Sequence, residues 1–301
     1  MRRRISGVLL LDKPVGISSN HALQAAKRLF RADKAGHAGT LDPLASGLLP
    51  VLLGDATRFS GYLLNAEKGY AAEIRLGSKT TTGDAEGEVL ERRPVTAGRS
   101  EVDGVLRSFV GHQTQIPPMY SALKRDGEPL YVLARRGESV ERAPRDIEIL
   151  RLQLDSFEAE TLWVSVTCSK GTYIRTLAED IGEALGCGAH LSGLRRTATG
   201  AFGIAEAVSL EELGRLGEDE RDALLRPADA VLGQLPRIEL DEATAGRFRH
   251  GQAVEIEGVS QGVNRVYAPS GRFLGLGEGV STGRLVPKRL LGERQEDSPT
   301  G

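Results

Sequence analysis

Apolar residues recur along this chain with two different periods. Residues 7–11 form a short apolar run typical of a buried strand, whereas residues 22–30 repeat apolar side chains at helical spacing behind the common helix caps Ser18, Ser19 and Asn20. The same patterns predict further strands at 70–77, 88–91, 147–157 and 162–168. They predict helices at 102–109 and 174–185, the second ending at Gly186. The expected fold class is therefore mixed α and β.

Proline and glycine divide the chain near its C-terminal end. The chain has 301 residues, which is more than one hydrophobic core usually supports. A proline-flanked stretch at 227–236 follows an acidic segment, and the residues after it combine strand-forming side chains with many glycines. We therefore expect a first domain at 1–232, a small β-rich domain at 236–292 and a disordered tail at 293–301.

Charge is unevenly distributed, although the formal net charge is only −2. Residues 1–37 carry eight Lys or Arg against two Asp, whereas residues 211–229 carry seven acids against three Arg. A basic patch on a nearly neutral protein suits a polyanion that is held in one orientation. A merely solvated N-terminal arm explains the same charges, and both interpretations stay open at this point.

Composition argues against several classes of protein. Cys168 and Cys187 form no Cys-x-x-Cys pair, which predicts neither a zinc module nor a disulfide scaffold and favours a reducing cytoplasm. No apolar stretch approaches the roughly 20 residues that a membrane-spanning helix needs. Asp12 cuts the apolar start too short for a secretion signal. Motifs of nucleotide hydrolases, zinc proteases and serine hydrolases are missing. We therefore expect no metal, no nucleotide cofactor and no membrane partner.

Residues 115–145 differ in amino-acid composition from the segments on either side. Two prolines open the segment, and several Lys and Arg residues are interleaved there with Tyr120 and Tyr131. Aromatic rings can stack on unpaired bases while guanidinium groups pair with phosphates, so the segment is a candidate RNA-contacting insertion. An ordinary solvated surface is an equally common explanation of such a run.

A glycine-rich loop around Asp42 is the first candidate for chemistry. Gly36 and Gly39 precede the acid, and His37 and Thr40 add polar groups beside it. An Asp followed by proline is commonly a helix cap, and taken alone this pair favours a cap. The density of glycine and polar side chains upstream exceeds what a cap requires. We therefore expect the loop to face a ligand, with Asp42 as its reactive group.

Arg175 is the second candidate, because it is an unusual residue for its position. If Thr172 caps the helix that follows, then Arg175 is its third residue, where an acid is favoured over a cation. An anionic partner would remove this conflict. Asp42 is one possible partner and would be kept charged and oriented by the pair. Glu179, one helical turn further on, is the alternative.

Three other side chains are candidates for contact with a nucleic acid base. Tyr70 and Tyr173 stand at the starts of predicted elements close to lysines, where their rings could stack on a base. His37 lies between two glycines and could wedge into nucleic acid. The more common roles for such residues are core aromatics and a surface histidine.

With these residues identified, the chain closely resembles the TruB family of tRNA pseudouridine synthases over nearly its whole length. Five blocks carry the resemblance, in the family's order: LDKPVG at 11–16, GHAGTLDPLASG at 36–47, KGY at 68–70, PPMYSALK at 117–124 and SKGTYIRTL at 169–177. The resemblance implies a mixed, largely antiparallel sheet with flanking helices, the pseudouridine synthase fold. It also implies an RNA-binding insertion at about 117–146 and a C-terminal RNA-binding domain of the PUA type at 236–292.

The resemblance also implies roles for individual residues. Asp42 would be the nucleophile, Arg175 its ion-pair partner, and Tyr70 the ring stacked on the target base and a candidate proton acceptor. Other substrate-binding roles would fall to His37, which fills the space of a flipped nucleotide, to Tyr173 and Leu194, which line the pocket, and to Lys13, which with Pro14 buttresses the cleft.

The implied activity is isomerisation of a T-loop uridine of tRNA, position 55, to pseudouridine, without a cofactor and by a chain expected to be a monomer. Extruding the base from its stack costs a few kcal/mol, which cationic and stacking contacts would offset. Two alternatives stay open. One is an RNA-binding or RNA-folding protein without catalysis, and the other is an isomerase that acts on ribosomal RNA or with a guide RNA.

Overall fold

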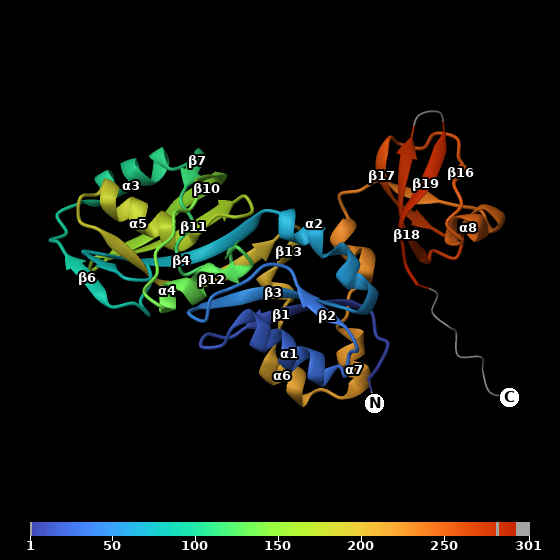
Figure 1. Ribbon diagram of the computed structural model, residues 1–301, viewed down its shortest axis with the longest axis horizontal. Helices are drawn as coiled ribbons and strands as arrows, with labels where there is room; N and C mark the ends of the chain where they lie inside the picture. The colour runs from blue at the N-terminus through green and yellow to red at the C-terminus, as the bar shows by residue number, and fades with distance from the viewer. Residues whose placement is uncertain (1, 281–282, 293–301) are drawn as a thin grey trace.

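The computed structural model describes residues 2–280 and 283–292 and contains a large ten-stranded sheet, a five-stranded sheet and two two-stranded sheets, one of which pairs β5 (Ser78–Thr80) with β6 (Val89–Arg92) (Figure 1). In the large sheet β1 pairs with β14 and β3 with β12 in parallel, whereas its other pairs are antiparallel. This confirms the mixed, largely antiparallel sheet. Its main path runs through β14 (Val208–Ser209), β1 (Gly7–Lys13), β3 (Ala45–Leu53), β12 (Ala189–Thr199), β4 (Lys68–Leu76), β11 (Thr161–Cys168), β10 (Arg145–Glu158) and β7 (Gly111–Gln115), with β2 (Ala35–His37) on β3 and β13 (Phe202–Gly203) on β12.

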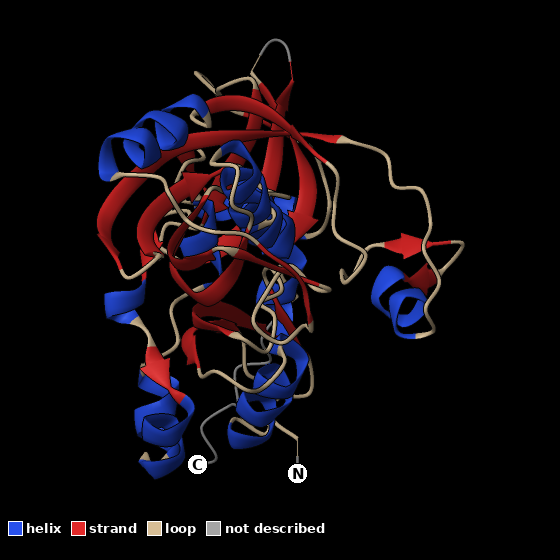
Figure 2. Cartoon of the chain, turned by 90° about the vertical axis from the view of Figure 1, so that its left-hand side faces the viewer, coloured by secondary structure: helices blue, strands red, loops and turns tan. Residues whose placement is uncertain are grey.

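Helices surround this sheet, which curves through the middle of the molecule (Figure 2). The Ser18 hydroxyl caps the first helix by accepting a bond from the amide of His21, and that helix buries Ala22 and Ala26 against β1 and β3. The later helix at 174 buries Leu177 against the other half of the sheet. The helices of this domain are α1 (Ser19–Leu29), α2 (Ser60–Asn65), α3 (Arg99–Ser108), α4 (Leu130–Arg135), α5 (Ile174–Ala184), α6 (Leu210–Arg215) and α7 (Glu218–Ala223), with short 3-10 turns η1 (Gly54–Phe59), η2 (Ile204–Glu206) and η3 (Ala228–Leu232).

The C-terminal domain is a five-stranded sheet with one helix. Its strand order is β15 (Arg237–Glu239), β17 (Gly262–Tyr267), β18 (Phe273–Val280), β19 (Arg284–Leu290) and β16 (Val254–Glu255), and its helix is α8 (Glu242–Arg249). The domain shares an apolar core with the larger one, where the rings of Phe59 and Phe273 are 5.7 Å apart between centroids. The boundary at 232–236 stays a prediction, and the tail predicted at 293–301 lies outside the described residues.

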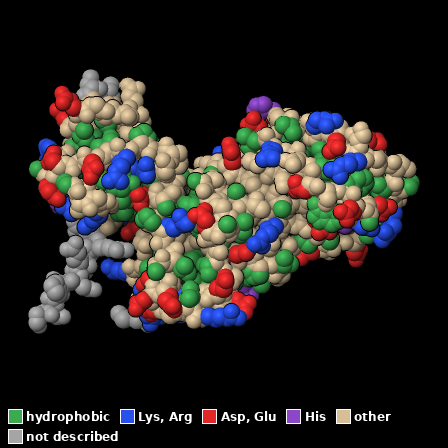
Figure 3. Space-filling view, turned by 180° about the vertical axis from the view of Figure 1, so that it is seen from behind, with side chains coloured by type: hydrophobic (Ala, Val, Ile, Leu, Met, Phe, Trp, Pro, Cys, Tyr) green, Lys and Arg blue, Asp and Glu red, His purple; other side chains and the backbone are tan. Residues whose placement is uncertain are grey.

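Two segments of opposite charge, the basic residues 1–37 and the acidic residues 211–229, are in contact in the fold. Arg3 pairs with Glu218 at 3.3 Å and also with Asp222, and Arg31 pairs with Glu218. Two of the eight cations counted in residues 1–37, Arg3 and Arg31, are therefore paired with acids of the 211–229 segment. Blue and red side chains are interspersed over the rear face accordingly (Figure 3).

The predicted insertion is an excursion between two neighbouring strands. Gln115 of β7 pairs with Arg145 of β10, so the chain leaves the sheet and returns to the same edge. In between lie β8 (Lys124–Arg125), β9 (Glu128–Pro129) and α4, which stand apart from the sheet at the right of Figure 2. No helix in the described ranges is long and apolar enough to cross a membrane.

Candidate active site

One row of residues crosses four strands in the centre of the large sheet. Lys13 on β1 faces Gly47 on β3, Gly47 faces Arg196 on β12, and Arg196 faces Tyr70 on β4. Directly opposed residues project to the same face of a sheet. Side chains of three strands that are distant in sequence therefore gather on one face. Leu194, two residues before Arg196, belongs to the same face.

Gly47 lets two backbones approach closely within this row. Its φ is +102°, and a Cβ atom there would lie 2.3 Å from the Arg196 carbonyl oxygen. A side chain would both strain the backbone and clash with β12. Gly47, five residues after Asp42, thus allows the short distance between β3 and β12.

We expect Gly47→Ala to reduce the free energy of unfolding by about 3 kcal/mol, from a strained backbone plus an overpacked contact. Urea unfolding measures it. Gly61→Ala is the matched control, because nothing lies within 4 Å of its would-be Cβ and the residue is in α2. That control should gain about 0.5 kcal/mol. Equal stability of both variants would contradict the close approach at Gly47.

The Asp42 loop is held by the segment that starts the first helix. The Ser19 hydroxyl accepts a bond from the amide of Leu41 at 2.7 Å and donates to the carbonyl of Leu41 at 2.9 Å. The Gly16 amide donates to the Pro43 carbonyl at 2.8 Å. No helix follows Asp42, because a turn leads directly into β3. The helix-cap interpretation of Asp42 and Pro43 is therefore wrong, and the carboxylate is 42% exposed and available.

Arg175 lies in the first turn of α5 and pairs with Asp42. Its Nη2 is 2.8 Å from the Asp42 Oδ2, and its Nε is 3.7 Å from the Asp84 Oδ2. The guanidinium also donates to the carbonyls of Thr82 at 3.1 Å and Tyr120 at 2.7 Å. The predicted anionic partner is thus confirmed as Asp42, joined by a second carboxylate that compensates for the unfavourable helix end.

Two details of the Arg175 prediction change. The helix cap is Tyr173, one residue later than predicted, which makes Arg175 the second helical residue. Among the described residues, no ion pair joins Arg175 to Glu179, the alternative partner. The side chain of Arg175 is only 6% exposed. Burial and its two carboxylate partners together hold the guanidinium in one position.

Tyr70 and Leu194 line the face beside this pair. Tyr70 is half-buried, and burial raises the pKa of its hydroxyl, with the nearby Arg196 guanidinium opposing the shift. The hydroxyl therefore keeps its proton at neutral pH. Leu194 faces Ala45, the first residue of β3 after the Asp42 loop, and Ala72 on β4. Asp42 lies close enough to influence the ionisation of Tyr70.

His37 and Tyr173 flank the site. His37 ends strand β2 instead of lying in a loop, and burial followed by the charge of Arg196 lowers its pKa, so the ring is neutral at pH 7. Tyr173 is anchored by Gln115, whose side-chain oxygen accepts from its amide at 3.0 Å and whose nitrogen donates to its carbonyl at 3.2 Å. Burial raises the pKa of the Tyr173 hydroxyl.

Lys13 is buried and bonded to the backbone of the segment that follows it. Its side chain has no exposed surface, and its ammonium donates to the carbonyls of Pro14 at 2.8 Å and Ile17 at 2.7 Å. Burial lowers its pKa to about 8, while the charge of Asp42 acts in the opposite direction. Lys13 therefore supports residues 14–17, in keeping with the buttressing role that the resemblance implies for it and Pro14, and it has no exposed surface for direct contact with a substrate.

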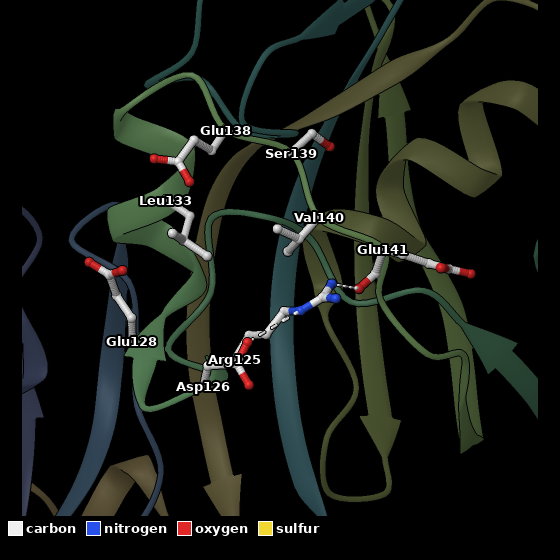
Figure 4. Close-up of a pocket in the computed structure, with 8 residues that line it drawn as sticks. All are labelled: Arg125, Asp126, Glu128, Leu133, Glu138, Ser139, Val140 and Glu141. Carbon is white, nitrogen blue, oxygen red and sulfur yellow. Dashed lines mark hydrogen bonds and ion pairs between the residues drawn. The ribbon is translucent and has the colours of Figure 1, made fainter.

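Sequence reasoning missed two charged residues of the site. One is Asp84, which is 3% exposed and pairs with Arg175. Arg196 is 1% exposed and was not singled out, although its spacing from Leu194 on an alternating strand places both on one face. A cavity of about 510 Å³ lies elsewhere, inside the insertion, and is lined by Arg125 and four acids and by none of the site residues (Figure 4).

The site combines a half-exposed carboxylate with an almost fully buried guanidinium that fixes it. A flat ligand could rest on the Tyr70 ring and the Leu194 side chain while the carboxylate attacks it or removes a proton. In the described part of the chain, no group of three or more His, Cys, Asp or Glu side chains is arranged to hold a metal ion.

Family models match most of the chain, from residue 27 to residue 291. Residues 27–174 match the family model of the TruB pseudouridylate synthase N-terminal domain. Residues 175–233 match the tRNA pseudouridylate synthase B C-terminal domain, and residues 236–291 match the C-terminal domain of pseudouridine synthase II TruB.

Individual relatives agree with the family models. The chain is 52% identical to tRNA pseudouridine synthase B of Methylobacillus flagellatus over 297 residues, covering 98% of each chain. It is 54% identical to the protein of the same name from Chromobacterium violaceum over 298 residues, covering 98% of this chain and 97% of the relative.

Solved structures show the same fold. A crystal structure of a Cbf5-Nop10-Gar1 complex contains a chain 28% identical to this one, with a TM-score of 0.71 over 92% of this chain and 79% of that one. An H/ACA RNP bound to a substrate RNA containing 2'-deoxyuridine matches in fold with a TM-score of 0.72 at 24% identity, over 96% of this chain and 86% of that one. The chain thus belongs to the TruB family and is a tRNA pseudouridine synthase.

Proposed function

We propose that this chain isomerises the T-loop uridine at position 55 of tRNA and that Asp42 is the nucleophile. The observation that carries the proposal is the 2.8 Å pair between Asp42 and the buried Arg175. A carboxylate that must react needs to be both oriented and reachable. The pair orients Asp42, while its side chain stays 42% exposed and its charge acts on Tyr70.

The reaction is an isomerisation in which no atom is gained or lost. The bond between C1′ and N1 of uridine breaks, the base rotates, and C1′ bonds to C5. The hydrogen on C5 leaves as a proton, and N1 takes up a proton. Asp42 can serve three routes: addition to C1′, addition to C6, or removal of a 2′ proton to form a glycal. Each begins at the same carboxylate.

The remaining site residues receive the extruded nucleotide in this proposal. The Tyr70 ring stacks on the target base, and Tyr173 and Leu194 close the pocket around it. Neutral His37 fills the space that the nucleotide leaves. Because the pKa of Tyr70 is raised, its hydroxyl must lose its own proton before it can accept the one from C5.

The insertion and the C-terminal domain are proposed to grip the tRNA. Tyr131 is 39% exposed on α4, and the Arg135 guanidinium lies 5.5 Å from its ring centroid. Such a pair suits stacking with an unpaired base. Acidic side chains line the cavity inside the insertion, so phosphate contacts are assigned to its outer basic residues. A monomeric state, a cytoplasmic location and the absence of a cofactor stay predictions.

Tritium release tests the substrate assignment. We expect one tritium to be released per molecule from a tRNA transcript labelled at C5 of its uridines, and none from a matched transcript with cytidine at position 55. Release from the cytidine transcript would move the target to another position. Binding of both transcripts without any release would favour the RNA-folding alternative, and turnover of a ribosomal RNA fragment alone would favour the third one.

A further inference from the structure

Arg196 is a buried cation that the proposed reaction has not used. It is 1% exposed, among the largest fully buried side chains of the described residues. In those residues it forms no ion pair with a carboxylate, whereas the equally buried Arg175 has two. A charge held in the interior without a countercharge is costly and is rarely retained without a specific role.

Its hydrogen bonds go to both ends of the loop that carries Asp42. The Arg196 Nε donates to the Leu48 carbonyl at 2.7 Å, and its Nη2 donates to the Gly39 carbonyl at 3.2 Å. Gly39 lies before Asp42 and Leu48 lies after it. One rigid guanidinium thus fixes the distance between the two arms of the loop. Gly39 has a φ of +100°, and a Cβ there would lie 3.3 Å from the Arg196 Nη1.

Tyr70 is the residue opposite Arg196 across the β12–β4 pair, and the charge of the guanidinium acts on its hydroxyl. The other ionisable groups that feel its charge are cationic or neutral bases: Lys13 on β1, His37 on β2 and Lys68 on β4. In the described part of the chain, no ion pair neutralises Arg196. Its positive charge is permanent, because arginine does not lose its proton in proteins.

We propose that Arg196 is a positioning residue of the isomerisation, which ties together both arms of the Asp42 loop and holds a fixed positive charge against the Tyr70 hydroxyl. This inference rests on the proposed roles of Asp42 and Tyr70. Of the two neighbouring arginines, Arg196 is thus assigned to the chemical step. Arg195 is exposed on the opposite face of β12, where it pairs with Asp12 at 2.7 Å.

Replacement of the guanidinium should slow the chemical step selectively. We expect Arg196→Gln to lower the single-turnover rate of tritium release about 100-fold, comparable to the loss of one preorganised electrostatic contact. The Kd for tRNA, measured by filter binding, should stay within about threefold, because Arg196 has almost no surface for RNA to reach. Arg195→Gln is the matched control and should keep the wild-type single-turnover rate.

The variant Arg196→Lys distinguishes the effect of the charge from the effect of packing. It also provides the test if Arg196→Gln does not fold. A lysine buried among the cations Lys13 and Lys68 has a lowered pKa. The rate of Arg196→Lys, divided by the wild-type rate at each pH, should therefore fall as the pH rises from about 7 to about 9, since the ammonium is lost. A purely structural role predicts a constant ratio.

Three results decide the inference. A wild-type single-turnover rate for Arg196→Gln, or a ratio for Arg196→Lys that does not change with pH, overturns it. A loss of tRNA affinity equal to the loss of rate also overturns it, because it would place Arg196 in binding. If Asp42→Asn stays active in the same assay, the proposed function fails, whereas an inactive Asp42→Asn beside a fully active Arg196→Gln removes only this inference.

Discussion

Asp42→Asn is expected to reduce the single-turnover rate of pseudouridine formation to below about one-thousandth of the wild-type rate, as happens when a nucleophile is removed. The amide keeps the shape of the side chain but cannot form the bond or accept the proton. Folding should change little, because Arg175 retains Asp84 as a partner. The Kd for tRNA should stay within a factor of about 3, because the grip is assigned to other surfaces.

The matched control for this variant is Asp12→Asn. Asp12 pairs with Arg195 at 2.7 Å, close to the 2.8 Å of Asp42 and Arg175, but on the opposite face of the strands. It should keep the wild-type rate. Tritium release and quantification of pseudouridine in the recovered tRNA measure both variants. Near-normal turnover by Asp42→Asn would remove Asp42 from the chemistry and leave the site without its proposed nucleophile.

Arg175→Gln should cost both stability and rate. The change leaves the carboxylate of Asp84, which is 4% exposed, without its cation, and it removes the donors to Thr82 and Tyr120. Removing one partner of a buried ion pair typically costs about 3 to 5 kcal/mol, so a loss in this range is expected in urea unfolding. The rate should fall at least about 100-fold, because Asp42 loses the group that orients it.

Two comparisons separate the stability effect from the catalytic effect. Arg175→Lys keeps the charge but not the paired donors, so it should recover most of the stability and little of the rate. Arg93→Gln is the control, because Arg93 also joins two carboxylates, Glu91 and Glu183, but at the surface. That control should leave both readouts nearly unchanged. A stable Arg175→Lys with full activity would contradict the orienting role.

Several features of the protein were readable in its local sequence. Apolar periodicity located helices α1, α3 and α5 and strands β1, β4, β6, β10 and β11, because alternation and helical spacing depend on near neighbours alone. Arg175 was found because a cation in the first turn of a helix conflicts with the helix dipole, and the structure confirms the inferred anionic partner. Asp42 was found by its glycine-rich loop, although the same residues also matched a helix cap that the fold does not form.

Other features depended on which strands become neighbours. Arg195 and Arg196 look equivalent in the sequence, yet one pairs at the surface and the other is enclosed behind Gly47. The charge asymmetry between the N-terminal segment and residues 211–229 suggested an open basic patch. The fold brings parts of the two segments together and pairs Arg3 with Glu218, whereas the basic patch stays a prediction.

Local sequence was thus enough to predict the fold class, the family and the pairing of Asp42 with Arg175. Strand pairing was needed to show that Asp84 shares Arg175, that Lys13 is fully buried, and that Arg196 stands between Gly47 and Tyr70. The physical reason is that local propensity acts over a few residues, whereas strand order and register are set by pairings between segments more than a hundred residues apart. Burial and charge compensation follow from those pairings.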